Sequence, residues 1–197
     1  MLRTSLVNFI AGIALLLIFP QWSEAQWVKN YLPYTNFLTI SALTVNGNNI
    51  FVGTDYGVFH SSDSGMSWKM VFPLSNGIVS ISQSSNSIFA GWYGGLFRSQ
   101  NNGITWNAES LGLPEEVYVY SIASYKSNML YAGTDLGMYL STDTGVSWSI
   151  VNTGFPVYYD IYAIAVNSRN IYAGTWRGVY RSIDSGTGDV PELVEIY

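Results

Sequence analysis

The strongest constraint on this chain is an internal repeat of about 40 residues, a period typical of propeller blades. Four segments begin with the same glycine, and in each of them further glycines follow four and twelve residues later. The starting glycines are Gly53, Gly91, Gly133 and Gly174, so successive units begin 38, 42 and 41 residues apart. This spacing leaves room for four short strands and their turns. The chain is therefore built by repetition of one small unit.

The third unit shows what that unit contains. Residues 120–124, 129–134, 137–142 and 147–151 are short β-prone runs separated by turn signals, which predicts a four-stranded antiparallel meander. One meander cannot bury both of its faces, and radial stacking leaves few exposed sheet edges. The sequence therefore predicts an all-β β-propeller of about four blades. A linear β-solenoid is the alternative, but its coils are usually shorter.

The turn after the third strand of each unit carries a recurring motif. An Asp or Asn side chain accepts hydrogen bonds from backbone N–H groups two or three residues on, a glycine adopts positive φ, and a Trp packs at the start of the fourth strand. The motif residues are Ser61, Asp63, Gly65 and Trp68; Ser99, Asn101, Gly103 and Trp106; Ser141, Asp143, Gly145 and Trp148; and Ser182, Asp184 and Gly186. Asn101 replaces the Asp of the second motif, and Asp189 stands where the fourth motif would have its Trp.

At these residues the chain resembles the BNR or Asp-box repeat family, which includes sialidases, sortilin-like receptors, xyloglucan-degrading enzymes and photosystem II assembly factors. The resemblance covers roughly residues 27–186. It implies that the Asp box is a folding element that lies away from the ligand face. We therefore expect Asp63, Asp143 and Asp184 to stabilise turns.

The N-terminus predicts a secretory signal peptide. Arg3 precedes an apolar run over residues 6–19, and Ser23-Glu24-Ala25 supplies the small residues of a cleavage site. We expect residues 1–25 to be removed, which leaves a secreted, cell-surface or periplasmic chain with no membrane span; an uncleaved anchor is the alternative. Residues 26–186 form the predicted propeller repeats, and residues 187–197 form a predicted linker or truncated C-terminal tail.

Composition excludes several classes of chemistry. The chain has no cysteine, so thiol catalysis and cysteine-ligated metal are absent. A net charge of −5, with only eight Lys and Arg residues, argues against nucleic acid as a partner. His60 is the single histidine and has no companion for a metal site, so we expect no metal and no cofactor.

Catalytic residues are not marked out in the sequence. Within residues 26–197 the only arginines are Arg98, Arg169, Arg177 and Arg181, and no arginine motif of the sialidase kind occurs near the expected mature N-terminus. Arg98 and Arg181 share one repeat register with His60 and Leu140, so equivalent strand positions explain them. Glycoside hydrolysis needs two carboxylates about 5 to 10 Å apart, and no such pair stands out. We expect a non-catalytic binding module; a partial or degenerate sialidase-like or xyloglucanase-like glycoside hydrolase is the alternative.

Candidate ligand-binding residues gather on the rim opposite the Asp boxes. The turns between the second and third strands supply Asp55, Tyr56, Trp92, Tyr93, Asp135, Trp176 and Arg177, and the connections between units supply Glu115, Glu116, Tyr158, Tyr159 and Asp160. Exposed aromatic rings beside carboxylates can stack on sugars or peptide side chains while accepting hydrogen bonds. This favours an extracellular glycan or protein as partner. The alternative is that the aromatic side chains only cover neighbouring blades.

Ring closure can also be predicted. Residues 27–31 match the fourth strand of a unit, whereas the last unit lacks a recognisable fourth strand. We expect residues 27–31 to pair with residues 178–182 and close a four-bladed ring. An open arc is the alternative, because four-bladed rings are at the small end of the usual range.

Overall fold

The chain forms four blades. The computed structural model describes residues 29, 31–33, 38–84, 86–126, 128–152, 155, 159–168, 170–182 and 193–196. Within these ranges, four antiparallel sheets each contain four strands that pair in chain order, as in a meander. The predicted all-β, propeller-type architecture is confirmed.

The strands of each blade are numbered in chain order. The first blade contains β1 (Ile40–Asn46), β2 (Asn49–Thr54), β3 (Gly57–Ser61) and β4 (Lys69–Pro73). The second contains β5 (Ser80–Ser84), β6 (Ser87–Trp92), β7 (Gly95–Ser99) and β8 (Asn107–Ala108). The third contains β9 (Val119–Tyr125), β10 (Met129–Thr134), β11 (Gly137–Ser141) and β12 (Ser149–Ile150). The fourth contains β13 (Ala163–Val166), β14 (Ile171–Thr175), β15 (Gly178–Ser182) and β16 (Leu193–Ile196).

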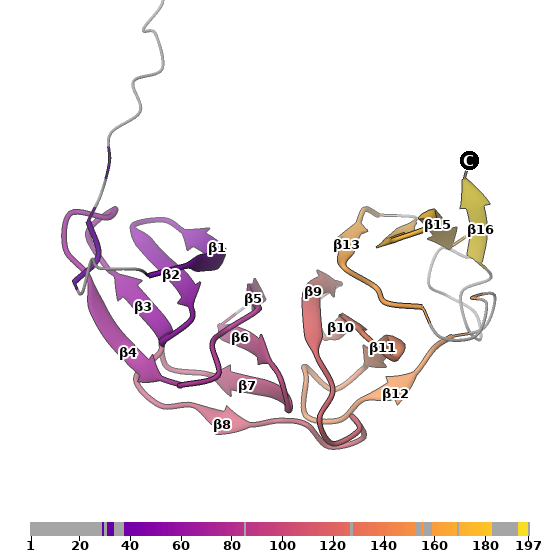
Figure 1. Ribbon diagram of the computed structural model, residues 1–197, viewed down its shortest axis with the longest axis horizontal. Helices are drawn as coiled ribbons and strands as arrows, with labels where there is room; N and C mark the ends of the chain where they lie inside the picture. Colours follow the sequence, from indigo (N-terminus) through magenta and orange to yellow (C-terminus); the bar gives the residue numbers. More distant parts are fainter. Residues whose placement is uncertain are drawn as a thin grey trace, which may run out of the picture.

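The blades stand side by side in an open arc. Figure 1 shows the first strands of the blades, β1, β5, β9 and β13, on the concave side of the arc, and the fourth strands on its outside. Each first strand is adjacent to the first strand of the next blade. The concave side is therefore where a propeller has its channel.

Hydrophobic cores lie between adjacent blades. The core between the first and second blades includes Phe51 and Ile88, and the core between the second and third includes Phe89 and Leu130. Tyr131 and Ile171 belong to the core between the third and fourth blades. Alternating side chains on each strand supply one face to each neighbour. The packing unit of this protein is therefore the interface between two blades.

The leading glycine of the repeat allows the next blade to approach closely. A Cβ atom added to Gly133 would lie 2.6 Å from the carbonyl oxygen of Ile161, which precedes the fourth blade. At Gly174, in the last blade, the nearest atom would be the Cβ of Ala163 at 3.4 Å, an ordinary contact. The glycine is thus required where another blade follows, which explains its place in the repeat.

The prediction that the N-terminal segment completes the last blade is wrong for this structure. Strand β16 pairs with β15, from Val179 opposite Ile196 to Ser182 opposite Leu193. The fourth-strand position is therefore filled by residues from the segment 187–197, which lacks the Trp-led motif that marks the other fourth strands. Residues 27, 28 and 30 lie outside the described residues, as does the predicted signal peptide.

The two ends of the arc leave apolar side chains exposed. Leu43 and Val45 of β1 are 63% and 57% exposed, whereas Ile81 of β5 is buried. Val179 in the last blade is also exposed. Among the described residues there is no helix long and apolar enough to cross a membrane.

Candidate functional site

The blades present two rims with different contacts. On one rim, the turns between second and third strands lie beside the segments that enter each blade. In the third blade, for example, the backbone N–H of Asp135 donates a hydrogen bond to the carbonyl of Tyr118 at 3.3 Å. On the other rim, the Asp-box loops contact the turns between first and second strands. There the N–H of Ser64 donates to Asn48, and that of Thr144 donates to Asn128, both at 3.0 Å. We call these the turn rim and the box rim.

Box carboxylates bind their own loops. Asp143 Oδ1 accepts hydrogen bonds from the backbone N–H groups of Val146 at 3.1 Å and Ser147 at 2.9 Å, and Oδ2 accepts one from the Ser147 hydroxyl at 2.6 Å. Asp63 makes the matching contacts with Ser67 at 2.8 and 2.6 Å. The carboxylate thus reaches three and four residues along the chain, one residue further than the sequence suggests.

These hydrogen bonds favour the ionised carboxylates. Hydrogen bonds from the Ser67 hydroxyl, the Ser67 N–H and the Ser61 hydroxyl lower the pKa of Asp63 to about 2. For Asp143, burial raises the pKa, but the hydrogen bonds from Ser147, Ser141 and Val146 outweigh it and bring the pKa to about 2. Their bonds are satisfied inside the loop, so these carboxylates are poorly placed to act as catalytic acids.

Box serine, glycine and tryptophan complete the loop. Ser141 Oγ donates to Asp143 and accepts from the N–H of Gly145, both at 2.8 Å. Trp68 and Trp106 donate their ring N–H to the box glycine carbonyls, at 3.0 and 3.1 Å. Trp148 instead donates to the carbonyl of Glu109, in the segment after the second blade. In the fourth box Ser182 is buried, and Asp184 and Gly186 lie outside the described residues.

The turn rim carries a row of tyrosines that spans three blades. Tyr93 follows β6, Tyr118 precedes β9, Tyr120 belongs to β9, and Tyr162 precedes β13. Ring centroids are 4.6 Å apart for Tyr93 and Tyr118, 5.8 Å for Tyr118 and Tyr120, and 5.2 Å for Tyr120 and Tyr162. Tyr118 and Tyr162 are 38% and 46% exposed. The tyrosine row is therefore continuous and accessible to a ligand.

Carboxylates surround the tyrosine row. The Tyr162 hydroxyl donates a hydrogen bond to Asp160 Oδ2 at 2.8 Å, and this bond is the main cause of the raised pKa of Tyr162. Burial, followed by the charge of Glu116, raises the pKa of Tyr93. Burial, followed by the charges of Asp160 and Asp135, raises the pKa of Tyr120. These phenols therefore stay protonated at neutral pH and can donate hydrogen bonds.

A second aromatic group, which we call the Trp176 cluster, lies in the fourth blade. The guanidinium carbon of Arg177 is 4.3 Å from the ring centroid of Trp176 and 5.7 Å from that of Tyr159. Tyr159 is buried, whereas Trp176 is 62% exposed. Trp176 is therefore a largely exposed ring that carries a cation over it and stacks with Tyr159 at 6.2 Å between centroids.

The other candidate residues are placed as follows. Trp92 is half-buried; its ring centroid lies 5.6 Å from that of Phe97, and it packs against the core between the first and second blades. It occupies the register of Thr54, which is fully buried, and not the register of Trp176. We expected Trp92 to lie on the surface beside Trp176, and the structure instead shows it half-buried.

Five further candidates bind backbone or are simply exposed. Asp55 Oδ1 accepts from the N–H of Thr39 at 3.2 Å, and Asp135 Oδ1 accepts from that of Tyr118 at 3.0 Å, so both fix the entry to a blade. Tyr56 is 53% exposed. Glu115 and Glu116 are exposed, and Tyr158 lies outside the described residues.

Sequence reasoning missed Tyr118, Tyr120 and Tyr162. Tyr118 and Tyr120 belong to the run Val117–Tyr120, where aromatic and β-branched residues alternate, and such alternation indicates a strand with one exposed face. That signal was available, but their alignment with Tyr93 and Tyr162 depends on how the blades stack. No group of three or more His, Cys, Asp or Glu side chains suited to a metal ion occurs in the described part of the chain.

Comparisons with known proteins support the fold. No family model matches the chain, and no curated protein matches it. Solved structures that are similar include an ancestral GH74 enzyme, with 25% identity over 80% of this chain and a TM-score of 0.64. The extracellular domain of BT4673 from B. thetaiotaomicron shows 17% identity over 79% of this chain and a TM-score of 0.64. YCF48 bound to D1 peptide shows 16% identity over 83% and a TM-score of 0.60.

All three similar proteins are larger than the part that is matched. The chain spans 25% of the GH74 enzyme, 22% of the BT4673 chain and 56% of the YCF48 chain. They include an enzyme, an extracellular domain and a peptide-bound protein, so the comparison establishes the propeller fold without selecting one activity.

Proposed function

We propose that this chain is an extracellular, non-catalytic binding module of the Asp-box type that recognises an extended glycan or peptide through the tyrosine row. The observation that carries this proposal is the continuous row from Tyr93 to Tyr162, which crosses three blades on one rim. The rings of Tyr118 and Tyr162 keep more than a third of their surface exposed, which rings that only cover a neighbouring blade would not require. Exposed aromatic rings with adjacent carboxylates are suited to stacking and hydrogen bonding at once.

The surroundings of the row indicate the chemistry of the ligand. Asp135 and Asp160 contribute negative charge, and the Tyr162 hydroxyl, which donates its hydrogen to Asp160, leaves its oxygen as an acceptor. Such a surface favours neutral or cationic ligands with hydroxyl or amide groups and repels phosphate backbones. The likeness to an extracellular domain and to a peptide-bound propeller supports both the location and the type of partner. Secretion through residues 1–25 is part of the same proposal.

Binding to glycan and peptide arrays tests the proposal. We expect wild-type protein to bind at least one neutral or cationic ligand, and the double variant Tyr118→Ala/Tyr162→Ala to lose about 10- to 100-fold in affinity, the range for aromatic hot spots. Tyr56→Ala is the matched control, because Tyr56 is also an exposed tyrosine on the turn rim but belongs to the first blade. Equal losses in both variants, or none in either, would refute the role of the row.

Turnover distinguishes this proposal from the glycoside hydrolase alternative. The wild-type protein is incubated with xyloglucan and with sialylated glycans, and released sugar is measured. We expect no release. Sustained release by the wild type would contradict a non-catalytic module.

A further inference from the structure

Arg98 of β7 is a buried cation with incomplete bonding. Its side chain is 93% buried, since only 7% of its surface is exposed, and its guanidinium carbon lies 5.7 Å from the ring centroid of Phe89. Nε donates to Ser87 Oγ at 3.1 Å, and one terminal nitrogen donates weakly to Thr144 Oγ1 at 3.5 Å. No carboxylate in the described part of the chain forms an ion pair with it. A guanidinium has five N–H donors, and an unpaired buried charge is costly.

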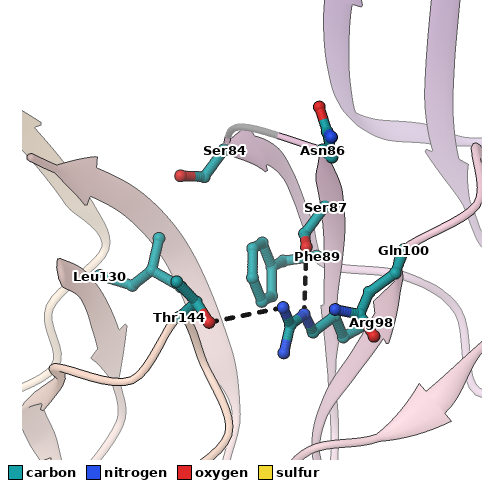
Figure 2. A pocket seen from close by; sticks show the side chains of 8 residues that line it. All are labelled: Ser84, Asn86, Ser87, Phe89, Arg98, Gln100, Leu130 and Thr144. Carbon is teal, nitrogen blue, oxygen red and sulfur yellow. Dashed lines mark hydrogen bonds between the residues drawn. The ribbon is translucent and has the colours of Figure 1, made fainter. Parts of the chain in front are cut away.

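A pocket opens beside this guanidinium. Figure 2 shows it between the second and third blades, with the guanidinium directed toward Thr144 across the opening. Its cavity volume is about 260 Å³. Its polar lining consists of Ser84, Asn86, Ser87, Gln100 and Thr144. Asn86 and Gln100 are exposed, so the pocket is open to solvent. Thr144 belongs to the third Asp box, which places the pocket on the box rim, away from the tyrosine row.

The same position in other blades shows that the charge is not needed for folding. In the first blade His60 stacks on Phe51 with 4.2 Å between ring centroids, and its ring nitrogen lies 2.9 Å from Asn49 Oδ1. Burial lowers the pKa of His60, so this ring is mostly neutral at pH 7. In the third blade the position is Leu140, which packs against the core. The repeat therefore tolerates a neutral or apolar side chain where the second blade has Arg98.

We propose that the Arg98 pocket binds a carboxylate that carries hydroxyl groups, such as a hexuronic acid. The planar guanidinium matches a carboxylate through two parallel N–H···O bonds and replaces the missing ion pair. The hydroxyl and amide groups of Ser84, Asn86 and Gln100 supply donors and acceptors for ligand hydroxyls, and the Thr144 oxygen, whose hydrogen is donated to the Asp143 carbonyl, supplies an acceptor. A volume slightly below the usual range of 300–1,000 Å³ for ligand sites fits a single sugar-acid unit.

Titration calorimetry with the full chain tests this site. The probes are D-glucuronate, acetate, D-glucose and sulfate. We expect glucuronate to bind most tightly, acetate more weakly, and glucose not at all. Arg98→Leu, which copies Leu140, should weaken glucuronate binding at least tenfold. Sulfate binding as tightly as glucuronate would overturn the carboxylate assignment, and absence of binding by both carboxylates would overturn the site.

Thermal unfolding and two further variants separate binding from folding. Arg98→Leu should unfold at the wild-type temperature or above, because it removes an unpaired buried charge. Glucuronate should raise the unfolding temperature of the wild type and not of Arg98→Leu. If Arg98→Leu fails to fold, Thr144→Ala on the opposite wall should still lower affinity several-fold, and unchanged affinity there would contradict the site. Tyr118→Ala/Tyr162→Ala, the variant that tests the turn rim, should leave glucuronate binding unchanged, so the two proposals can fail independently.

Discussion

The box rim and the turn rim differ in how strictly they repeat. On the box rim, Asp63 and Asp143 make nearly the same hydrogen bonds in different blades; Asn101 keeps the one from the backbone and reverses the one with the hydroxyl. On the turn rim, the blades share only a small scaffold, such as the Thr54 and Thr134 hydroxyls that donate to the carbonyls of the glycines three residues on. The side chains outside that scaffold vary from blade to blade. Strict repetition therefore marks residues that fold each blade, and variation marks positions that the fold does not fix.

The largest effect should come from the box glycine. Gly145 has φ of +86°, and an added Cβ would lie 2.5 Å from Cε1 of Phe89. Gly145→Ala should therefore cost about 2 to 5 kcal/mol, from left-handed strain and overpacking together. Gly47→Ala is the control, because Gly47 also has positive φ (+59°) but would meet no atom within 4 Å. It should cost only about 1 to 2 kcal/mol in denaturant unfolding. Equal losses would show that contact with Phe89 is unimportant.

The next largest effect should be the difference in stability loss between Trp92→Ala and Trp176→Ala on the turn rim. Trp92 is half-buried against Phe97, so Trp92→Ala should cost about 1 to 3 kcal/mol, less than for a fully buried Trp. Trp176 is mostly exposed, and Trp176→Ala should cost less than about 1 kcal/mol. Chemical denaturation of both variants checks this. A larger loss at Trp176 would make the Trp176 cluster a packing element and remove it from any binding surface.

Removal of a box carboxylate should have a moderate effect. Asp143→Ala loses four hydrogen bonds to its loop and should cost about 1 to 2 kcal/mol, as for a lost helix cap or buried polar contact. Because the folded-state pKa of about 2 is below the usual Asp value near 4, this stabilisation is present above about pH 4 and is lost as the pH falls toward 2.

Unfolding of Asp143→Asn between pH 7 and pH 2 checks the sign. The free energy of unfolding of this variant should decrease less steeply than that of the wild type below pH 4, because the titrating group at Asp143 is gone while Asp63 remains. A wild type that becomes more stable on acidification would contradict the proposed role of the carboxylates.

The smallest effect should come from Asn101, which stands where the first and third boxes have an Asp. Asn101 Oδ1 accepts from the Thr105 N–H at 2.9 Å, and its Nδ2 donates to the Thr105 hydroxyl at 2.8 Å. In Asn101→Asp the hydroxyl can donate in return, as the hydroxyls of Ser67 and Ser147 do. The change in unfolding free energy should stay below about 1 kcal/mol. A loss as large as that of Asp143→Ala would mean that the second box depends on its amide.

The features of the fold that depend on contacts within one repeat unit could be predicted from the sequence. The repeat length, the strands of the third unit and the propeller architecture follow from glycine spacing and alternation. β12 is shorter than the expected run, because Trp148 belongs to the box loop. β16 was missed, since residues 193–196 lack the box Trp that marks other fourth strands.

What the sequence could not predict depends on contacts between blades. The tyrosine row joins residues that are far apart along the chain, from Tyr93 to Tyr162, and strand alternation does not say which blade covers which ring. The same applies to Arg98, whose burial and pocket require Thr144 from the next blade. Trp92 could have been assigned correctly, because the repeat aligns it with the inward-facing Thr54.

The most direct test of the account is the affinity of Asp143→Ala for a ligand selected on the arrays, measured by calorimetry at a temperature where this variant is fully folded. If the boxes serve folding and the turn rim serves recognition, the affinity should stay within about twofold of the wild type while the unfolding temperature falls. Loss of binding by tenfold or more with unchanged unfolding would place recognition on the box rim and contradict the account.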